Sequence, residues 1–255
     1  MSKRVNSICP IPCIFIGTLL VCIAAPITAF SATNMLIWPI DPALGAKDNA
    51  TELWLENKGT SVATMQIRVL GWQQVNGEEN YRNQQDVVAS PPIVNISAGK
   101  KQLIRLIRQS PTPAGKEQAF RILIDEVPSP DHSSANQAGV SLLMRYSLPL
   151  FVYGDGVNFQ RNASQPVQLN QSQLSWKTIT NNGHPALEVT NQGAIHARLS
   201  KVSINGKPIA DGLLGYVLAH SKRVWPLPPS VSRGEKHLKA EVNNDANIWQ
   251  SGPTP

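Results

Sequence analysis

Ala138-Gly-Val-Ser-Leu-Leu-Met-Arg-Tyr-Ser-Leu-Pro-Leu-Phe-Val152 is the stretch that decides how this chain is interpreted. Side chains alternate along an extended strand, so the stretch has two faces. One face carries Val140, Leu142, Met144 and Tyr146, and the other carries Ser141, Leu143, Arg145 and Ser147. An uncovered apolar row on a sheet edge is an aggregation hazard. A stretch that keeps such a row therefore predicts a surface that receives another chain by strand pairing. The alternative is a central strand buried on both faces.

Residues 1–31 are predicted to be a signal peptide. Lys3 and Arg4 supply the positive start, residues 11–25 are mostly apolar, and the small residues Ala29 and Ser31 favour cleavage after Ser31. An uncleaved anchor is the alternative. All three cysteines, Cys9, Cys13 and Cys22, lie in this leader. The mature chain is therefore expected to have no disulfide and to depend on core burial. No later segment has eighteen consecutive apolar residues, so we expect no membrane insertion after cleavage.

The charge of the chain is only mildly basic. The full chain carries +6, and loss of Lys3 and Arg4 leaves +4. Basic residues are spread out rather than gathered in a stripe with interleaved aromatic residues, which argues against nucleic acid as a partner. A modestly basic surface is equally compatible with an acidic protein partner.

Strand patterns dominate the whole chain and helix patterns are scarce. Short alternating segments separated by turn residues indicate an all-β fold with two antiparallel sandwiches. The predicted organisation is a first domain over residues 32–152, a hinge at 153–157 around Gly154-Asp-Gly156, and a second domain over 158–255. The tail from Trp249 to Pro255 is expected to fray. The predicted strands lie at 51–57, 63–72, 93–96, 102–107, 118–127, 174–179, 186–190, 197–203, 213–218, 224–228 and 237–242.

Motifs for catalysis are missing from the sequence. The mature chain has no cysteine nucleophile, none of its five histidines has a partner at zinc-ligand spacing, and no serine lies in a Gly-x-Ser-x-Gly context. Asp125 and Glu126 are adjacent, so they point to opposite sides of a strand and cannot form an acid–base pair. We therefore predict no catalytic residues, no metal and no cofactor.

Six segments follow one another along the chain in a fixed order. They are Leu53-Trp-Leu-Glu-Asn57, Ser90-Pro-Pro92, Ala98-Gly-Lys-Lys-Gln-Leu-Ile-Arg-Leu106, Phe120-Arg-Ile-Leu-Ile-Asp-Glu-Val-Pro128, Arg145-Tyr-Ser-Leu-Pro-Leu-Phe151, and Gly215-Tyr-Val-Leu with Trp225-Pro-Leu227. Together they resemble the PapD-like periplasmic chaperones of chaperone–usher pilus assembly, over residues 35–242. The Ile37-Trp-Pro-Ile-Asp-Pro42 start and Arg145-Tyr-Ser147 are similar to the archaic branch.

The resemblance implies two immunoglobulin-like domains in a boomerang arrangement, located in the periplasm. It also implies that the last strand of domain 1 fills the groove of a pilus subunit that lacks a strand, which is donor-strand complementation. The subunit then passes to an outer-membrane usher, where the extension of the next subunit displaces the donor without ATP. How the free chaperone protects its own apolar row is left open between disorder of the loop and self-association. On this chain the donor residues would be Ala138, Val140, Leu142 and Met144.

One departure from the family concerns the carboxylate anchor. The well-studied branch holds the C-terminal carboxylate of the subunit with an Arg and a Lys, but the matching positions here hold Asp41 and Pro149. Arg121 is the first candidate for a replacement, because a guanidinium suits bidentate carboxylate recognition. The alternative for Arg121 is solvation, or pairing within the chain to Glu117, Asp125 or Glu126. Arg145 and Arg105 are the second candidates.

Glu117 matches an acidic interdomain position of the family, but the usual Arg partner is replaced by Tyr153. That bridge is therefore in doubt.

Two other functions stay open beside the chaperone. One is a secreted adhesin or carbohydrate-binding module, and the other is a periplasmic hydrolase with a dispersed site. A binding module would expose aromatic residues, whereas Trp54, Trp72, Trp176 and Trp225 fall mostly in strand patterns that indicate core positions.

Overall fold

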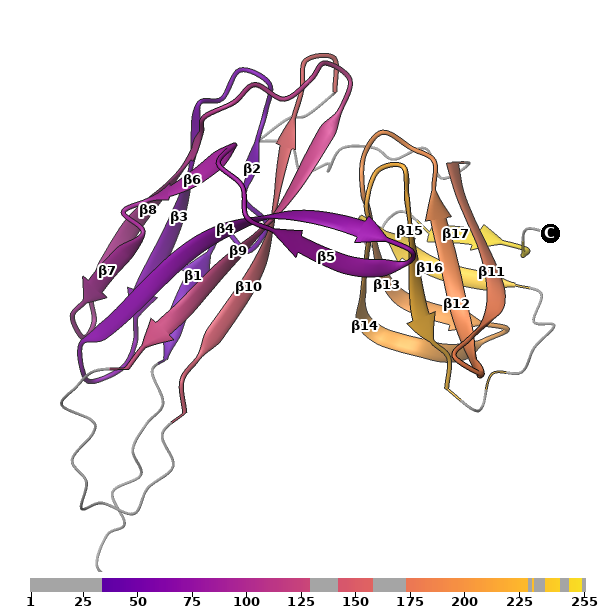
Figure 1. Cartoon of the computed structure of the whole chain (residues 1–255). Helices are drawn as coiled ribbons and strands as arrows, with labels where there is room; N and C mark the ends of the chain where they lie inside the picture. Colours follow the sequence, from indigo (N-terminus) through magenta and orange to yellow (C-terminus); the bar gives the residue numbers. More distant parts are fainter. Residues whose placement is uncertain are drawn as a thin grey trace, which may run out of the picture. The chain divides into compact units, whose positions relative to one another are not determined.

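The computed structural model describes residues 34–128, 142–157, 173–228, 231, 237–243 and 248–253. These residues form four β-sheets, and no described segment is a helix long and apolar enough to cross a membrane. The first two sheets, coloured from indigo to rose in Figure 1, run in the orders β1-β3-β8-β6 and β2-β10-β9-β4-β5, with β7 also paired to β4. Their strands are β1 (Met35–Trp38), β2 (Ala43–Leu44), β3 (Ala50–Asn57), β4 (Ala63–Val75), β5 (Glu78–Arg82), β6 (Val87–Ser90), β7 (Ile93–Ile96), β8 (Lys101–Arg108), β9 (Glu117–Val127) and β10 (Arg145–Tyr153).

The first two sheets enclose one apolar core between them. Alternation along β9 shows how it forms, because Phe120, Ile122 and Ile124 point inward while the residues between them point outward. The other sheet contributes the facing side chains of the core, including Leu53, Leu55, Ile104 and Leu106. The inward and outward faces of β9 are therefore fixed, and the outward face is available for a site.

The other two sheets, coloured orange to yellow in Figure 1, have the orders β11-β12-β15 and β14-β13-β16-β17. They enclose a second core around Trp176, Leu187 and Val217. Their strands are β11 (Leu174–Asn181), β12 (His184–Asn191), β13 (Ala197–Ile204), β14 (Lys207–Val217), β15 (Ser221–Pro226), β16 (Leu238–Val242) and β17 (Ile248–Ser251). The all-β prediction is confirmed.

The strand predictions are confirmed for the long alternating segments and wrong at the C-terminus. Trp249 lies in β17, which pairs with β16, and its side chain is buried in the second core rather than frayed. The aromatic side chain outweighs the polar residues around it because burying a Trp removes a large apolar area from water. The sequence analysis also missed β5, whose residues Glu78–Arg82 are polar and pair only with β4.

Each sandwich contains a buried asparagine that binds the backbone across a turn. Asn57 is fully buried at the end of β3, where its Nδ2 donates to the carbonyls of Ser61 (2.7 Å) and Ile96 (2.8 Å), and its Oδ1 accepts from Gly59 N (2.9 Å). Asn191, at the end of β12, does the same for its own turn. Its Nδ2 donates to Ile195 O (2.8 Å), and its Oδ1 accepts from Gly193 N (2.8 Å). The two sandwiches therefore share the same local motif, a buried asparagine that hydrogen-bonds the backbone of the following turn.

Candidate strand-addition site

The hydrogen bonds of β10 alternate between its two sides. Glu126 N donates to Met144 O (2.9 Å), and Gly154 N donates to Lys116 O (2.8 Å), so even-numbered residues exchange their hydrogen bonds with β9. The N–H and C=O groups of the odd-numbered residues point away from β9. β2 pairs with β10 only at Phe151 and Val152. Among the described residues, the outer edge of β10 from Arg145 to Pro149 therefore carries no neighbouring strand.

The even-numbered side chains form one apolar row that leaves the core gradually. Leu150 is fully buried, Tyr146 and Leu148 are partly buried against the first core, Met144 is 37% exposed, and Leu142 is 65% exposed. The odd-numbered neighbours Leu143, Arg145 and Ser147 are exposed on the opposite face. Leu142 and Met144, which were predicted as donor residues, lie just before β10 and are exposed. Ala138 and Val140 lie outside the described residues.

Two acidic side chains of β9 hold the start of β10. Glu126 Oε2 accepts from Met144 N (3.1 Å), and Asp125 accepts from Arg145 Nε and from Arg68 Nη2 (2.7 Å). Burial alone would raise the pKa of Asp125, but the hydrogen bonds from Arg145 and Arg68 outweigh it and lower the pKa. Arg145, the second candidate anchor, therefore already shares a carboxylate within the chain.

Arg121 lies on the outward face of β9, opposite Leu70 of β4 and Pro149 of β10. Its guanidinium carbon lies 3.8 Å from the ring centroid of Trp72 and 5.5 Å from that of Tyr216. The predicted alternative of pairing to Asp125 is not what this arrangement shows, since that carboxylate contacts Arg68 and Arg145. Within the described part of the chain, the buried Nε of Arg121 has no hydrogen-bond partner. The stacking on Trp72 is favourable but leaves hydrogen-bonding capacity on the guanidinium.

Arg105 is not brought together with these residues. It is exposed on β8, in the sheet that does not contain β10, and it pairs in register with Glu52 and Ser90. The apolar row and Arg145 therefore lie together. Arg121 lies on the same sheet, on β9, four residues from the Asp125 that pairs with Arg145. Arg105 lies on the other sheet.

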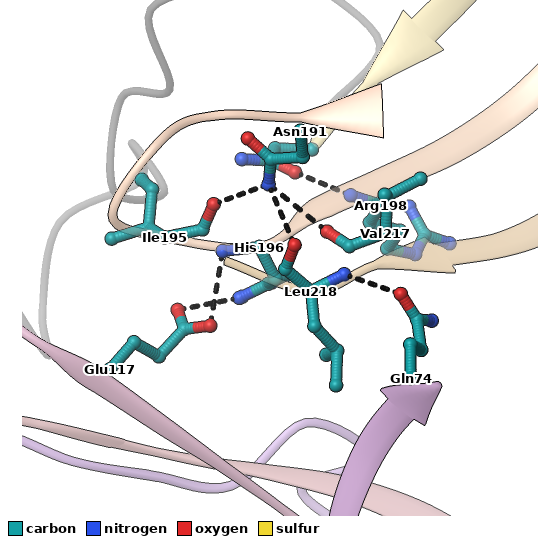
Figure 2. A network of polar contacts seen from close by, with 9 residues as sticks. Gln74, Glu117, Asn191, Ile195, His196, Arg198, Val217 and Leu218 are labelled. Atoms are coloured by element: carbon teal, nitrogen blue, oxygen red, sulfur yellow. Dashed lines mark hydrogen bonds and ion pairs between the residues drawn. The ribbon is translucent and has the colours of Figure 1, made fainter. Parts of the chain in front are cut away.

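Glu117 forms the bridge that the sequence analysis left in doubt, with a different partner. Its side chain is only 1% exposed, and it accepts from His196 N (3.0 Å) and from His196 Nδ1 (2.7 Å), as Figure 2 shows. The Tyr153 hydroxyl also hydrogen-bonds this carboxylate, and burial together with the Glu117 charge raises the pKa of Tyr153. The His196 ring stacks on Phe151 with centroids 3.5 Å apart. Phe151 and Tyr153, in the last part of β10, are thus tied to the second sandwich.

Further contacts between the two sandwiches come from the β4–β5 hairpin, which the sequence analysis did not single out. Gln74 Nε2 donates to Tyr216 O (2.8 Å). Leu218 N donates to Gln74 Oε1 (3.0 Å), as Figure 2 shows. At the hairpin tip, Gly77 O accepts from Val224 N (3.0 Å) and from Arg223 Nη1 (2.6 Å). No local pattern could have indicated these pairs, because their members lie more than 140 residues apart.

Two immunoglobulin-like sandwiches, with an open edge strand on the first that continues into exposed apolar residues, define a class of two-domain β-proteins able to add a strand from another chain. A family model described as the pili and flagellar-assembly chaperone, PapD N-terminal domain, matches residues 43–158. No curated protein sequence matches the chain.

A chain in the crystal structure of the CsuC–CsuE chaperone–tip adhesion subunit pre-assembly complex, from archaic chaperone-usher Csu pili of Acinetobacter baumannii, is similar over nearly its whole length. The identity is 31%, the TM-score is 0.66, and the match covers 85% of this chain and 96% of that one. The chain therefore belongs to the PapD-like family of pilus-assembly chaperones, as the sequence analysis predicted. This family is a chaperone family, which is not an enzyme class. The adhesin alternative is not favoured.

Two more distant structures share the fold. One is the Salmonella enterica SafA pilin in complex with the SafB chaperone, with 18% identity, a TM-score of 0.64, and coverage of 88% of this chain and 98% of that one. The other is the E. coli chaperone DraB, with 16% identity, a TM-score of 0.62, and coverage of 88% and 98%.

Proposed function

We propose that this chaperone binds pilus subunits by lending them the residues that lead into β10, and then delivers them to an outer-membrane usher. The observation that supports this most is the graded apolar row, from fully buried Leu150 to Leu142 at 65% exposed. A row that only served the chain's own core would end where the core ends. This one continues past it, next to a strand edge with unused hydrogen-bonding groups.

A subunit that lacks one strand exposes an apolar groove and an unpaired edge, both of which promote aggregation. Ala138, Val140, Leu142 and Met144 would fill the groove, while the backbone of β10 would pair with the subunit strand beside it. Full burial of a Leu or Met side chain contributes about 1.5–3 kcal/mol. The flexible Met144 side chain suits an irregular pocket.

Lysine substitutions on the two faces test the proposal. The chain is expressed together with the genes adjacent to its own, and the subunit that co-purifies with the tagged wild-type chain is quantified. Leu142→Lys and Met144→Lys place a charge in the groove and are expected to reduce recovery at least about tenfold. The matched control is Leu143→Lys, because Leu143 is 52% exposed on the opposite face and its substitution leaves the groove apolar. Equal recovery with all three variants would contradict the proposed donor row.

Arg121 is proposed as the anchor for the C-terminal carboxylate of the subunit. Its guanidinium lies against Trp72 and Tyr216 and hydrogen-bonds Tyr81, but its Nε has no partner, whereas Arg145 is committed to Asp125. Arg121→Ala is expected to abolish subunit recovery while the chaperone stays folded, and Arg121→Lys is expected to restore it only in part, because an ammonium cannot bind bidentately. Arg145→Ala and Arg105→Ala are measured beside it. Loss of recovery with either of these, and not with Arg121→Ala, would move the anchor to that residue.

The location and limits of the mature protein complete the proposal. Residues 1–31 are proposed to direct export to the periplasm and to be removed there, with domain limits at 32–152 and 158–255 around a hinge at 153–157. Cell fractionation tests the export, and N-terminal sequencing of the mature chain tests the removal of residues 1–31. Recovery of the chain outside the outer membrane would instead support a secreted protein. Gel filtration of the free chain reports whether it self-associates.

A further inference from the structure

Pro149 lies inside β10, directly opposite Arg121 of β9. A proline has no N–H group, so in the middle of a sheet it removes a ladder hydrogen bond. Residue 149 is odd-numbered, however, and the odd-numbered residues of β10 direct their backbone groups away from β9. The β9–β10 ladder therefore loses nothing, and the missing donor falls on the open outer edge.

The outer edge consequently offers a short and defined set of partners. Arg145 and Ser147 are exposed and each present one N–H and one C=O, whereas Pro149 is buried and presents only its carbonyl. From Phe151 onward, β2 occupies the edge. An incoming strand that begins pairing near Met144 thus meets its last free N–H donor at Ser147.

We infer that Pro149 is the register stop for the guest strand, ending its pairing after Ser147 and so deciding which guest residues face Leu142 and Met144. This inference rests on the proposed function. The register matters because a slip of one residue turns every guest side chain to the other face, and a slip of two moves each guest pocket to the next donor residue, about 7 Å along the strand. The donor residues differ in shape, so the slipped pairing places a Leu pocket against Met144.

The interaction partner is defined by the same chemistry. It is an extended segment of a pilus subunit with an unpaired edge, whose pairing with β10 spans the Arg145–Ser147 stretch and ends beside Pro149. With Pro149 in place, a register shifted two residues toward the Phe151 end lacks a donor at residue 149. With an alanine there, the shifted register gains an N–H···O bond.

Cysteine cross-linking in the co-purified complex reads the register directly, because the mature chain has no cysteine of its own. Met144→Cys is combined with single cysteines along the edge strand of the co-purified subunit. A disulfide needs Cα atoms about 4.4–6.8 Å apart, so positions two residues apart are distinguished. With Pro149 present, one subunit position is expected to cross-link.

In Pro149→Ala, the ratio of cross-linking two residues away to cross-linking at the original position is expected to rise about fivefold, the effect of one added backbone hydrogen bond of ~1 kcal/mol. An unchanged single position in Pro149→Ala would overturn the register stop. Failure of every subunit position to cross-link, in a wild-type complex that still forms, would instead overturn the proposed function.

Ser147→Pro separates the two ideas again. It removes a donor from the same outer side and leaves the ladder to β9 intact, so strand pairing predicts at least about fivefold lower subunit recovery. Undiminished recovery would count against pairing along this edge as such.

Discussion

Replacing Glu117 with alanine is expected to destabilise the chaperone strongly, because this carboxylate is buried and satisfies several donors at once. It accepts from the backbone N–H and Nδ1 of His196 and from the Tyr153 hydroxyl. In Glu117→Ala these donors stay buried beside a small cavity that offers them no acceptor. Each unsatisfied buried group costs about 1–3 kcal/mol. We therefore expect a loss of about 3–4 kcal/mol.

Thermal unfolding followed by calorimetry measures this loss. For a chain of this size, 1 kcal/mol corresponds to about 2–4 °C, so the midpoint is expected to fall by about 6–16 °C. Glu117→Gln keeps the shape and one acceptor oxygen, so its loss is expected to be smaller. The control is Glu52→Ala, since Glu52 is exposed and its carboxylate accepts from Trp54 Nε1 at the surface (3.1 Å). The reasoning is refuted if Glu117→Ala lowers the midpoint no more than Glu52→Ala does.

Two further predictions concern the same junction. Gly77 has φ +86°, and a Cβ there would lie 2.5 Å from Val224 Cγ2, so Gly77→Val is expected to cost about 2–4 kcal/mol of stability. The control is Gly99→Val, because Gly99 has φ +70° but open space around it, so this variant measures the cost of the backbone conformation alone. Equal thermal midpoints for the two variants would rule out a tight hairpin contact. The pKa of Tyr153 is raised in the folded state by burial and by Glu117, so its contribution to stability is fully present below its unfolded pKa of about 10 and is lost as the pH rises above that value. Midpoints measured from pH 8 to 11 should fall less steeply for Tyr153→Phe than for the wild type, with the remaining slope due to Tyr81 and Tyr216, whose pKa values are also raised by burial; parallel curves would contradict the assignment.

The strands could be predicted where apolar residues alternate over a long segment. β9 is the clearest case, since one face reads Phe120, Ile122, Ile124 and the structure buries those side chains. β5 was not predicted because its polar residues contribute little to a core and are held by pairing with β4. The tail was wrongly predicted to fray for the opposite reason, because one buried aromatic residue, Trp249, stabilises a strand among polar neighbours.

The candidate site divides in the same way. The donor row stays a prediction: alternation indicates which residues share a face, and the structure shows Leu142 and Met144 exposed just before β10. The partner of Glu117 could not be predicted, because His196 lies 79 residues away and only the folded chain brings the two together. Similarly, the resemblance implied that Pro149 stands where the well-studied branch has a Lys, but only the register showed that its missing donor faces the open edge.

The two buried asparagines, Asn57 and Asn191, bear on how local unfolding would spread. Each hydrogen-bonds the backbone of a turn in its own sandwich, so these bonds in one sandwich do not depend on the other. Loss of one asparagine is expected to unfold the sandwich that contains it and to leave the other sandwich folded. The proposed anchor, Arg121, lies over Trp72 of the first sandwich and near Tyr216 of the second. If Arg121 is the anchor, subunit binding is therefore expected to be lost before the fold as a whole.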